Sequence, residues 1–142
     1  METGLKNLKE LFDLEDRDLR TYSPLTLAYI GDAVYELVIR TILVKKGNRQ
    51  VNKLNQRANS LVKASAQSQI IEKLLPLLSE EELAVYKRGR NAHSATMAKN
   101  ATVADYRRAT GFEALMGYLY LKEDYPRIAE LVRAGIGEDI YE

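Results

Sequence analysis

Two acidic residues, Asp32 and Glu113, lie in the middle of strongly apolar segments. Asp32 occurs in LAYIGDAVYE (27–36) and Glu113 in TGFEALMGYLYL (110–121). Neither has a Lys or Arg three or four residues away, where a helical ion pair would form. An unpaired carboxylate in an apolar setting is costly, so the counter-charge must come from elsewhere in the fold or from a bound ion.

Glycines accompany both acids, although glycine inside a helix costs about 1 kcal/mol relative to alanine. A close approach of another helix would account for Gly31, Gly111 and Gly117. If the two helices cross near Gly31 and Gly111, the two carboxylates share one oxygen-lined site. Oxygen ligands without His or Cys favour Mg²⁺ or Mn²⁺, and such an ion activates water against a phosphodiester.

A plainer interpretation remains open for each acid alone, namely a half-buried carboxylate that is hydrogen-bonded to a tyrosine or a backbone amide. Both acids taken together with the charge distribution favour the metal site. Residues 1–36 contain four Lys or Arg and eight Asp or Glu, residues 40–108 contain fourteen and five, and residues 109–142 contain three and seven. The middle of the chain therefore predicts a basic surface, although solvated helix faces would give the same counts.

Composition excludes several other classes of site. The 142 residues suffice for one domain, predicted here as 1–142. The absence of Cys rules out disulfides, zinc fingers and thiol catalysis, and a single His, His93, cannot build a histidine zinc site. No apolar run approaches the length of a membrane span and the N-terminus lacks a signal-like stretch, so we expect a cytoplasmic protein with no membrane partner.

Apolar spacing and capping residues predict helices throughout and no sheet. Ser23-Pro24, Ser79, Thr102 and Asp124 are typical of helix N-termini. The expected helices span about 5–14, 24–46, one or two within 51–75 with a break near Ser65, 80–90, 103–121 and 125–135, with a loop over 91–101. The helix over 24–46 is apolar nearly all round, which predicts a buried central helix. The fold class is therefore all-α, a bundle of six or seven helices.

The segments around the two acids resemble a known family. Residues 27–34 resemble the signature helix of the ribonuclease III catalytic domain, and residues 112–121 resemble that family's second catalytic helix. Residues 87–92 resemble one branch of this family, the small bacterial enzymes called Mini-III. The members of that branch lack a double-stranded-RNA-binding domain, as this sequence does. The resemblance runs from about residue 24 to 132.

This resemblance implies an all-α homodimer that cuts both strands of duplex RNA by metal-dependent hydrolysis, leaving 5′-phosphate and 3′-hydroxyl ends. For the Mini-III branch it implies maturation of the ends of the 23S ribosomal RNA precursor, assisted by a large-subunit ribosomal protein bound to the substrate. A non-catalytic RNA-binding module on the same fold is the alternative. The presence of Asp32 and Glu113 favours the enzyme, because a pure binding module has little reason to present acids to an anionic duplex.

By position, Asp32 and Glu113 match the family's metal-binding acids and would hold Mg²⁺ (or Mn²⁺) and the attacking water. The wider family has further acids that this chain lacks, at the places of Leu25, Ala28 and Thr110. Mini-III proteins share this thinner pattern. Glu36 lies one helical turn after Asp32, which makes it a candidate supplementary acid.

The basic segment supplies the candidate RNA contacts, since duplex RNA is bound mainly through phosphates and 2′-hydroxyls. The first set is Lys87, Arg88, Arg90, Asn91 and Lys99. The second set is Lys63 with Lys53, Arg57, Ser65 and Gln67. Two cuts on two strands require two sites, which a two-fold dimer provides. We expect the apolar surface of the 24–46 helix, including Leu25 and Tyr29, to form the dimer interface.

Overall fold

The computed structural model describes residues 2–92 and 102–137, and over these residues it contains helices and no strand. The predicted all-α fold is confirmed. The elements are α1 (Glu2–Leu11), the 3-10 turn η1 (Leu19–Thr21), α2 (Pro24–Lys46), α3 (Val51–Val62), α4 (Ala64–Leu74), the 3-10 turn η2 (Leu75–Leu77), α5 (Glu80–Asn91), α6 (Val103–Leu121) and α7 (Tyr125–Ile136).

Local capping explains where the helices begin. The Ser23 hydroxyl accepts a hydrogen bond from the Thr26 amide at 3.1 Å at the start of α2. Ser79 and Glu82 form a reciprocal capping box at the start of α5, with bonds of 2.8 and 3.1 Å. The break between α3 and α4 falls at Lys63, whose extended backbone separates the two helices.

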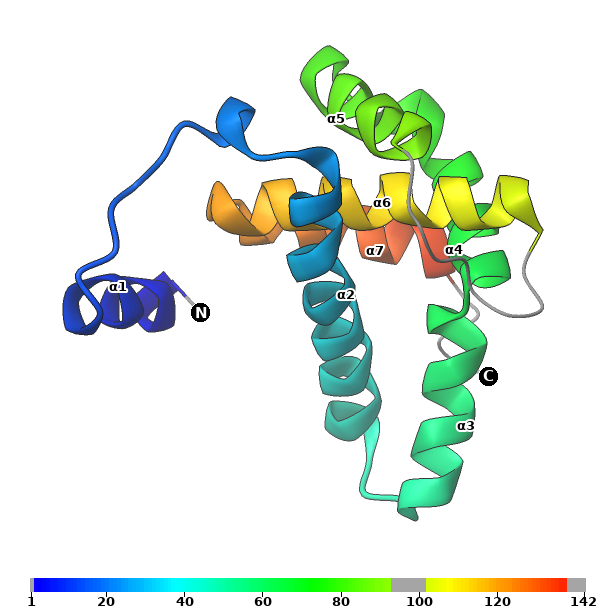
Figure 1. The fold of residues 1–142 in the computed structure, drawn as a ribbon. Coiled ribbons are helices and arrows are strands. Elements are labelled where there is room, and N and C mark those ends of the chain that lie inside the picture. Colours follow the sequence, from blue (N-terminus) through cyan, green and yellow to red (C-terminus); the bar gives the residue numbers. More distant parts are fainter. Residues whose placement is uncertain (1, 93–101, 138–142) are drawn as a thin grey trace.

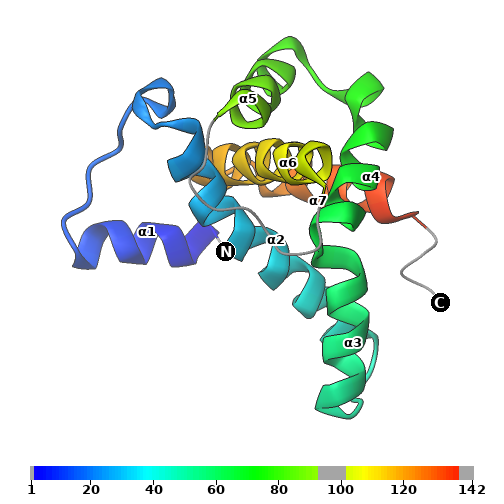
Figure 2. The same cartoon turned by 45° about the vertical axis from the view of Figure 1, so that its right-hand side comes forward.

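Helix α6 is the centre of the molecule. Helices α2, α4, α5 and α7 all pack against it, and Figures 1 and 2 show α2 crossing it while α7 runs alongside. Phe112, Leu115 and Met116 in its middle are fully buried. Because the helix is covered on several sides, its apolar residues surround it rather than forming one stripe.

Helix α2 differs from the prediction of a helix buried all round. One side packs on α6, where Leu27, Tyr35 and Ile39 are at most 1% exposed. The other side is open, and Tyr29 is 83% exposed. The apolar pattern of this helix therefore combines a core face with an uncovered one.

The first helix lies apart from the bundle (Figure 1). It ends at Leu11, earlier than the predicted end at residue 14, so Phe12 lies beyond the helix and is exposed. The Lys9 ammonium links this helix to the bundle through an ion pair of 3.2 Å with Glu123. Among the described residues, none of the helices is both long and apolar enough to cross a membrane.

Candidate active site

Helices α2 and α6 cross in direct backbone contact. A Cβ atom at Gly31 would overlap the carbonyl oxygen of Glu113, and one at Gly117 would overlap the carbonyl oxygen of Leu27. The predicted crossing at Gly31 is therefore correct. Gly111 also marks a close helix approach, as predicted, but the approaching helix is α5 rather than α2, and a Cβ at Gly111 would lie 2.7 Å from Tyr86.

This crossing brings Asp32 and Glu113 together. The Asp32 side chain is exposed and that of Glu113 is half-buried, so the pair lies where the crossing meets the surface. Burial, a hydrogen bond with Asp32 and the negative charge of Asp32 together raise the pKa of Glu113 to about 8. Two carboxyl groups thus share one site, and one of them holds its proton near neutral pH when no cation is bound.

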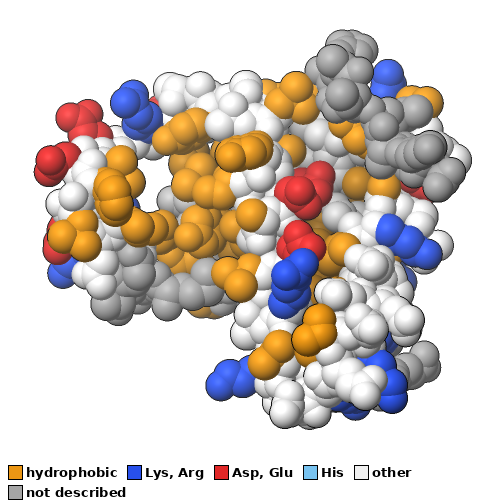
Figure 3. Space-filling model, turned by 60° about the horizontal axis from the view of Figure 1, so that its bottom comes forward, with side chains coloured by type: hydrophobic (Ala, Val, Ile, Leu, Met, Phe, Trp, Pro, Cys, Tyr) orange, Lys and Arg blue, Asp and Glu red, His pale blue; other side chains and the backbone are white. Residues whose placement is uncertain are grey.

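Neither acid forms an ion pair with a Lys or Arg in the part of the chain that the structure describes. Figure 3 shows the molecule turned so that its lower face comes forward, with acidic side chains gathered near the middle of the view beside hydrophobic ones. The negative charge at the crossing is therefore available to a cation from solution.

Glu36 does not join this pair. Its Oε1 accepts a hydrogen bond from the Arg40 guanidinium at 2.9 Å, one turn further along α2. Within residues 2–92 and 102–137, no three His, Cys, Asp or Glu side chains come together as metal ligands. The prediction of Glu36 as a supplementary acid is therefore not supported by the arrangement.

The donor set fits magnesium. Two carboxylates offer hard oxygen ligands, and Mg²⁺ in proteins is commonly held by one or two carboxylates while it keeps several waters. The raised pKa of Glu113 reflects the mutual repulsion of two negative charges in addition to burial. A divalent cation between them would relieve that repulsion.

Gln67 lies beside Glu113, and its burial there differs from the prediction. The sequence predicts it as an RNA contact, yet it is 3% exposed, and its side chain lowers the pKa of Glu113. A polar residue in the first turns of a helix gave no signal that it would be buried against another helix.

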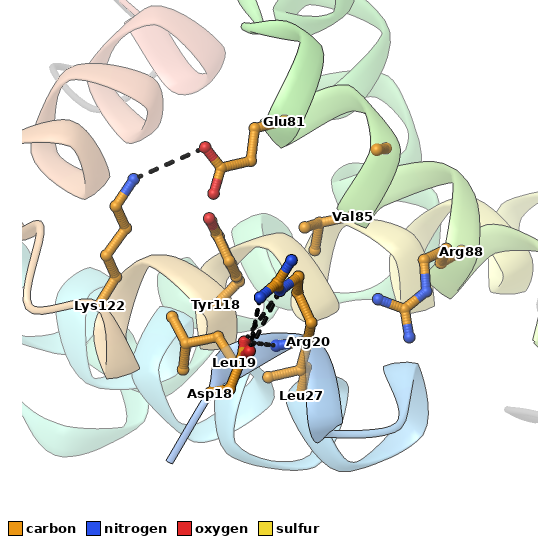
Figure 4. Close-up of a pocket in the computed structure, with 10 residues that line it drawn as sticks. Asp18, Leu19, Arg20, Leu27, Glu81, Val85, Arg88, Tyr118 and Lys122 are labelled. Atoms are coloured by element: carbon orange, nitrogen blue, oxygen red, sulfur yellow. Dashed lines mark hydrogen bonds and ion pairs between the residues drawn. The ribbon is translucent and has the colours of Figure 1, made fainter. Parts of the chain in front are cut away.

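The predicted RNA-contact segment of α5 divides between two surfaces. Lys87 and Arg88 are exposed. Arg88 lines a cavity of about 610 Å³ between η1, α5 and the end of α6, together with Leu27 and Tyr118 (Figure 4). The other cations in this view are already paired, with Arg20 bound to Asp18 and Lys122 near Glu81.

Arg90 and Asn91 line a different cleft, of about 420 Å³, at the start of α6. Arg107 and Arg108 line the same cleft, so three arginines contribute to its walls. Sequence reasoning did not single out Arg107 or Arg108, although both belong to the basic middle of the chain. Arg107 and Arg108 come four and five residues after Val103, the first residue of α6, and only the fold shows that they lie opposite the end of α5.

Lys63 lies at a second polar surface. It lines a shallow hollow of about 430 Å³ with Val62 and with three polar residues of α3, which are Gln56, Asn59 and Ser60. Those polar residues were also missed from the sequence. Lys99 and His93 lie outside the described residues.

The residues predicted for a dimer interface are accessible in the single chain. Leu25 is 38% exposed and Tyr29 is 83% exposed, and Leu37 and Val44 continue the apolar surface along α2. A surface of this kind on one helix is typical of an interaction site.

Comparison with known proteins places these features in context. A family model described as the ribonuclease III domain matches residues 25–124, which include both Asp32 and Glu113. A protein named Mini-ribonuclease 3 from Clostridium tetani is 50% identical over 127 residues, covering 89% of this chain and 83% of the relative. One of the same name from Thermoanaerobacter is 42% identical over 137 residues, 96% of each chain. A crystal structure of a Fusobacterium nucleatum protein is 35% identical with a TM-score of 0.75, covering 82% of this chain and 93% of that one.

Proposed function

This chain belongs to the ribonuclease III family and is an endoribonuclease, and we propose that it cleaves double-stranded RNA with a divalent metal ion held by Asp32 and Glu113. The observation that carries the proposal is the meeting of these two acids at the crossing of α2 and α6. Asp32 raises the pKa of Glu113, and neither acid has a cationic partner in the described part of the chain.

The two acids differ in burial, and this suggests that they contribute differently to the metal site. The backbone of Glu113 packs directly against Gly31 of α2, so the helix crossing fixes the position of Glu113. Asp32 is exposed to solvent, where a substrate can reach it. The bound ion, Mg²⁺ or Mn²⁺, would supply a water activated for attack on phosphorus and would stabilise the developing negative charge.

The surroundings support an RNA duplex as substrate. Duplex RNA is recognised through phosphates and 2′-hydroxyl groups, which suit the guanidinium groups at the α5–α6 cleft and the polar hollow on α3. In this proposal the phosphate contacts come from Lys63, Lys87, Arg88, Arg90 and Asn91, with Lys99 as a further candidate. We add Arg107, because it lines the same cleft as Arg90.

We extend the proposal to the biological substrate and assembly. The specific substrate would be the 23S ribosomal RNA precursor in the cytoplasm, with a large-subunit ribosomal protein assisting on the RNA. A homodimer formed through the exposed apolar side of α2 would present two acidic pairs to two strands.

A cleavage assay tests the metal site. A 5′-labelled RNA duplex is incubated with the protein in Mg²⁺ and in EDTA, and the end groups of the products are determined. We expect cleavage in Mg²⁺ only, with 5′-phosphate and 3′-hydroxyl ends. Asp32→Asn and Glu113→Gln should each reduce the rate at least 10³-fold, roughly the scale of a lost essential catalytic group.

Glu36→Gln is the matched control, because Glu36 is an acid on the same helix that pairs with Arg40 instead. It should retain activity within a few-fold. RNA that is bound and left uncut in both buffers would contradict the proposal and favour a binding module. A precursor transcript carrying the ends of 23S ribosomal RNA, with cut sites mapped, tests the substrate.

A further inference from the structure

Gln67 is a buried amide that joins the end of α3 to the acidic pair. Its side-chain nitrogen donates a hydrogen bond of 2.7 Å to the carbonyl oxygen of Val62, the last residue of α3. The hydroxyl of Tyr35 donates one of 2.7 Å to the neighbouring carbonyl of Leu61. Both carbonyls would otherwise lack partners at a helix end, so these bonds fix the α3–α4 junction.

The side chains of Tyr35 and Gln67 also lie next to the acidic pair. Tyr35 follows Asp32 by three residues on α2. Its ring packs edge to face against that of Phe112, the neighbour of Glu113, with 4.9 Å between the ring centroids. The Gln67 side chain also acts on the Glu113 carboxyl group, whose pKa it lowers as a hydrogen-bond donor would. An amide nitrogen has two hydrogens, so one can be given to Val62 and the other to Glu113.

The amide oxygen of Gln67 takes part in neither of these interactions. It is buried and has no hydrogen-bond partner among the described residues. A buried acceptor without a partner costs about 1–3 kcal/mol, so such an atom needs an explanation. A metal-bound water is a strong donor, and Mg²⁺ keeps several waters when two carboxylates hold it.

We propose that Gln67 is a positioning residue of the metal site: its amide nitrogen, anchored on Val62, orients the Glu113 carboxylate, and its amide oxygen accepts a hydrogen bond from a water on the metal ion. The inference rests on the metal site proposed above. Gln67 touches neither the ion nor the RNA in this role. Partners of metal ligands commonly change metal affinity or activity 10- to 100-fold when they are removed.

The first test needs no substitution. The side-chain amide signals of Gln67 are followed by NMR in the full-length protein while Mg²⁺ is added without RNA. We expect the Gln67 signals to shift with the same midpoint as the metal-binding curve, and those of exposed Gln69 on the same helix to stay in place. Gln67 signals that do not respond to saturating Mg²⁺ would overturn the proposal.

The second test uses Gln67→Met, which keeps the side-chain length and removes both the donor and the acceptor. Mn²⁺ binding to the RNA-free protein is measured from the EPR signal of the free ion. We expect the dissociation constant to rise about tenfold, and the Mg²⁺ concentration for half-maximal cleavage to rise in parallel, while kcat at saturating Mg²⁺ falls less. Ser68→Ala, which also alters a buried residue of α4, should leave both quantities within twofold.

The outcomes separate this inference from the metal site itself. Unchanged Mn²⁺ affinity in a folded Gln67→Met protein overturns the role of Gln67 while wild-type cleavage in Mg²⁺ remains. Wild-type protein that neither binds Mn²⁺ nor cleaves RNA would instead remove the proposed metal site. If Gln67→Met does not fold, the NMR test of the wild-type protein decides.

Discussion

Gly31 in α2 lies directly against the carbonyl group of Glu113 in α6, so that a Cβ atom at position 31 would overlap the backbone of the other helix. This contact sets the separation of the two helices at the point where each carries an acid. Position 31 therefore determines both the stability of the crossing and the placement of the acidic pair.

Gly31→Ala should push the helices apart. The added methyl group would meet Glu113 and, at 2.7 Å, the amide nitrogen of Gly117, and backbone atoms cannot rotate away as a side chain can. We expect a loss of about 3 kcal/mol in the free energy of unfolding, at the upper end for overpacked cores. Urea denaturation measures it. Gly47→Ala is the matched control, since nothing lies within 4 Å of its Cβ position, and should change stability by less than about 0.5 kcal/mol.

The raised pKa of Glu113 predicts how stability depends on pH without metal. Between the ordinary value of 4.5 and about 8, the folded chain holds a proton that the unfolded chain has released. The free energy of unfolding in EDTA should therefore fall as the pH rises across this window. Glu113→Gln should remove that fall and stabilise the protein at pH 8 by about 1–3 kcal/mol, since one pKa unit corresponds to about 1.4 kcal/mol.

Glu10→Gln, on the exposed side of α1, serves as control and should follow the wild-type pH profile. Adding Mg²⁺ at pH 8 should stabilise the wild type and leave Glu113→Gln almost unaffected, because binding to the folded state alone raises stability. A Glu113→Gln protein whose stability declines with pH as steeply as the wild type would contradict the assignment.

Most helix boundaries could be predicted from the sequence because their causes are local. Ser23-Pro24 and Gly47 mark the ends of α2, and both marks act within a few residues. The meeting of Asp32 with Glu113 was also foreseeable, because glycines inside apolar helices indicate close contact. Resemblance to a known family then assigned chemistry to the two acids.

Other features depended on contacts that periodicity does not encode. Apolar residues around α2 do not reveal which side the chain itself covers, so the exposure of Tyr29 was predicted only through the expected dimer. Gly111 looked equivalent to Gly31 but packs on α5. The burial of Gln67 follows from the turn at Lys63, which directs α4 against α6.

The exposed side of α2 predicts the oligomeric state. Leu25 and Tyr29 lie on this side, and a charge placed there would be buried without a partner in a dimer. Leu25→Glu combined with Tyr29→Glu should convert a dimer into monomers by analytical ultracentrifugation, with the helical content unchanged. Val51→Glu, at an exposed apolar position on α3, should remain dimeric. Dimers that persist in the double variant would place the interface elsewhere.

The cleft at the start of α6 predicts an RNA contact that sequence reasoning missed. Arg107 is exposed and lines this cleft with Arg90 and Arg108, whereas Arg108 is also bound to Glu72 at 3.1 Å. Arg107→Ala should therefore weaken duplex binding through the loss of one phosphate contact, by up to about tenfold near 0.1 M salt.

Binding is measured in EDTA, where the proposed enzyme does not cut, at several salt concentrations. The slope of log K against log salt should decrease in magnitude by about one for Arg107→Ala, uniformly across duplex sequences. Arg133→Ala, an exposed arginine near the end of α7, should leave both affinity and slope unchanged. Equal slopes for wild type and Arg107→Ala would show that the duplex does not enter this cleft.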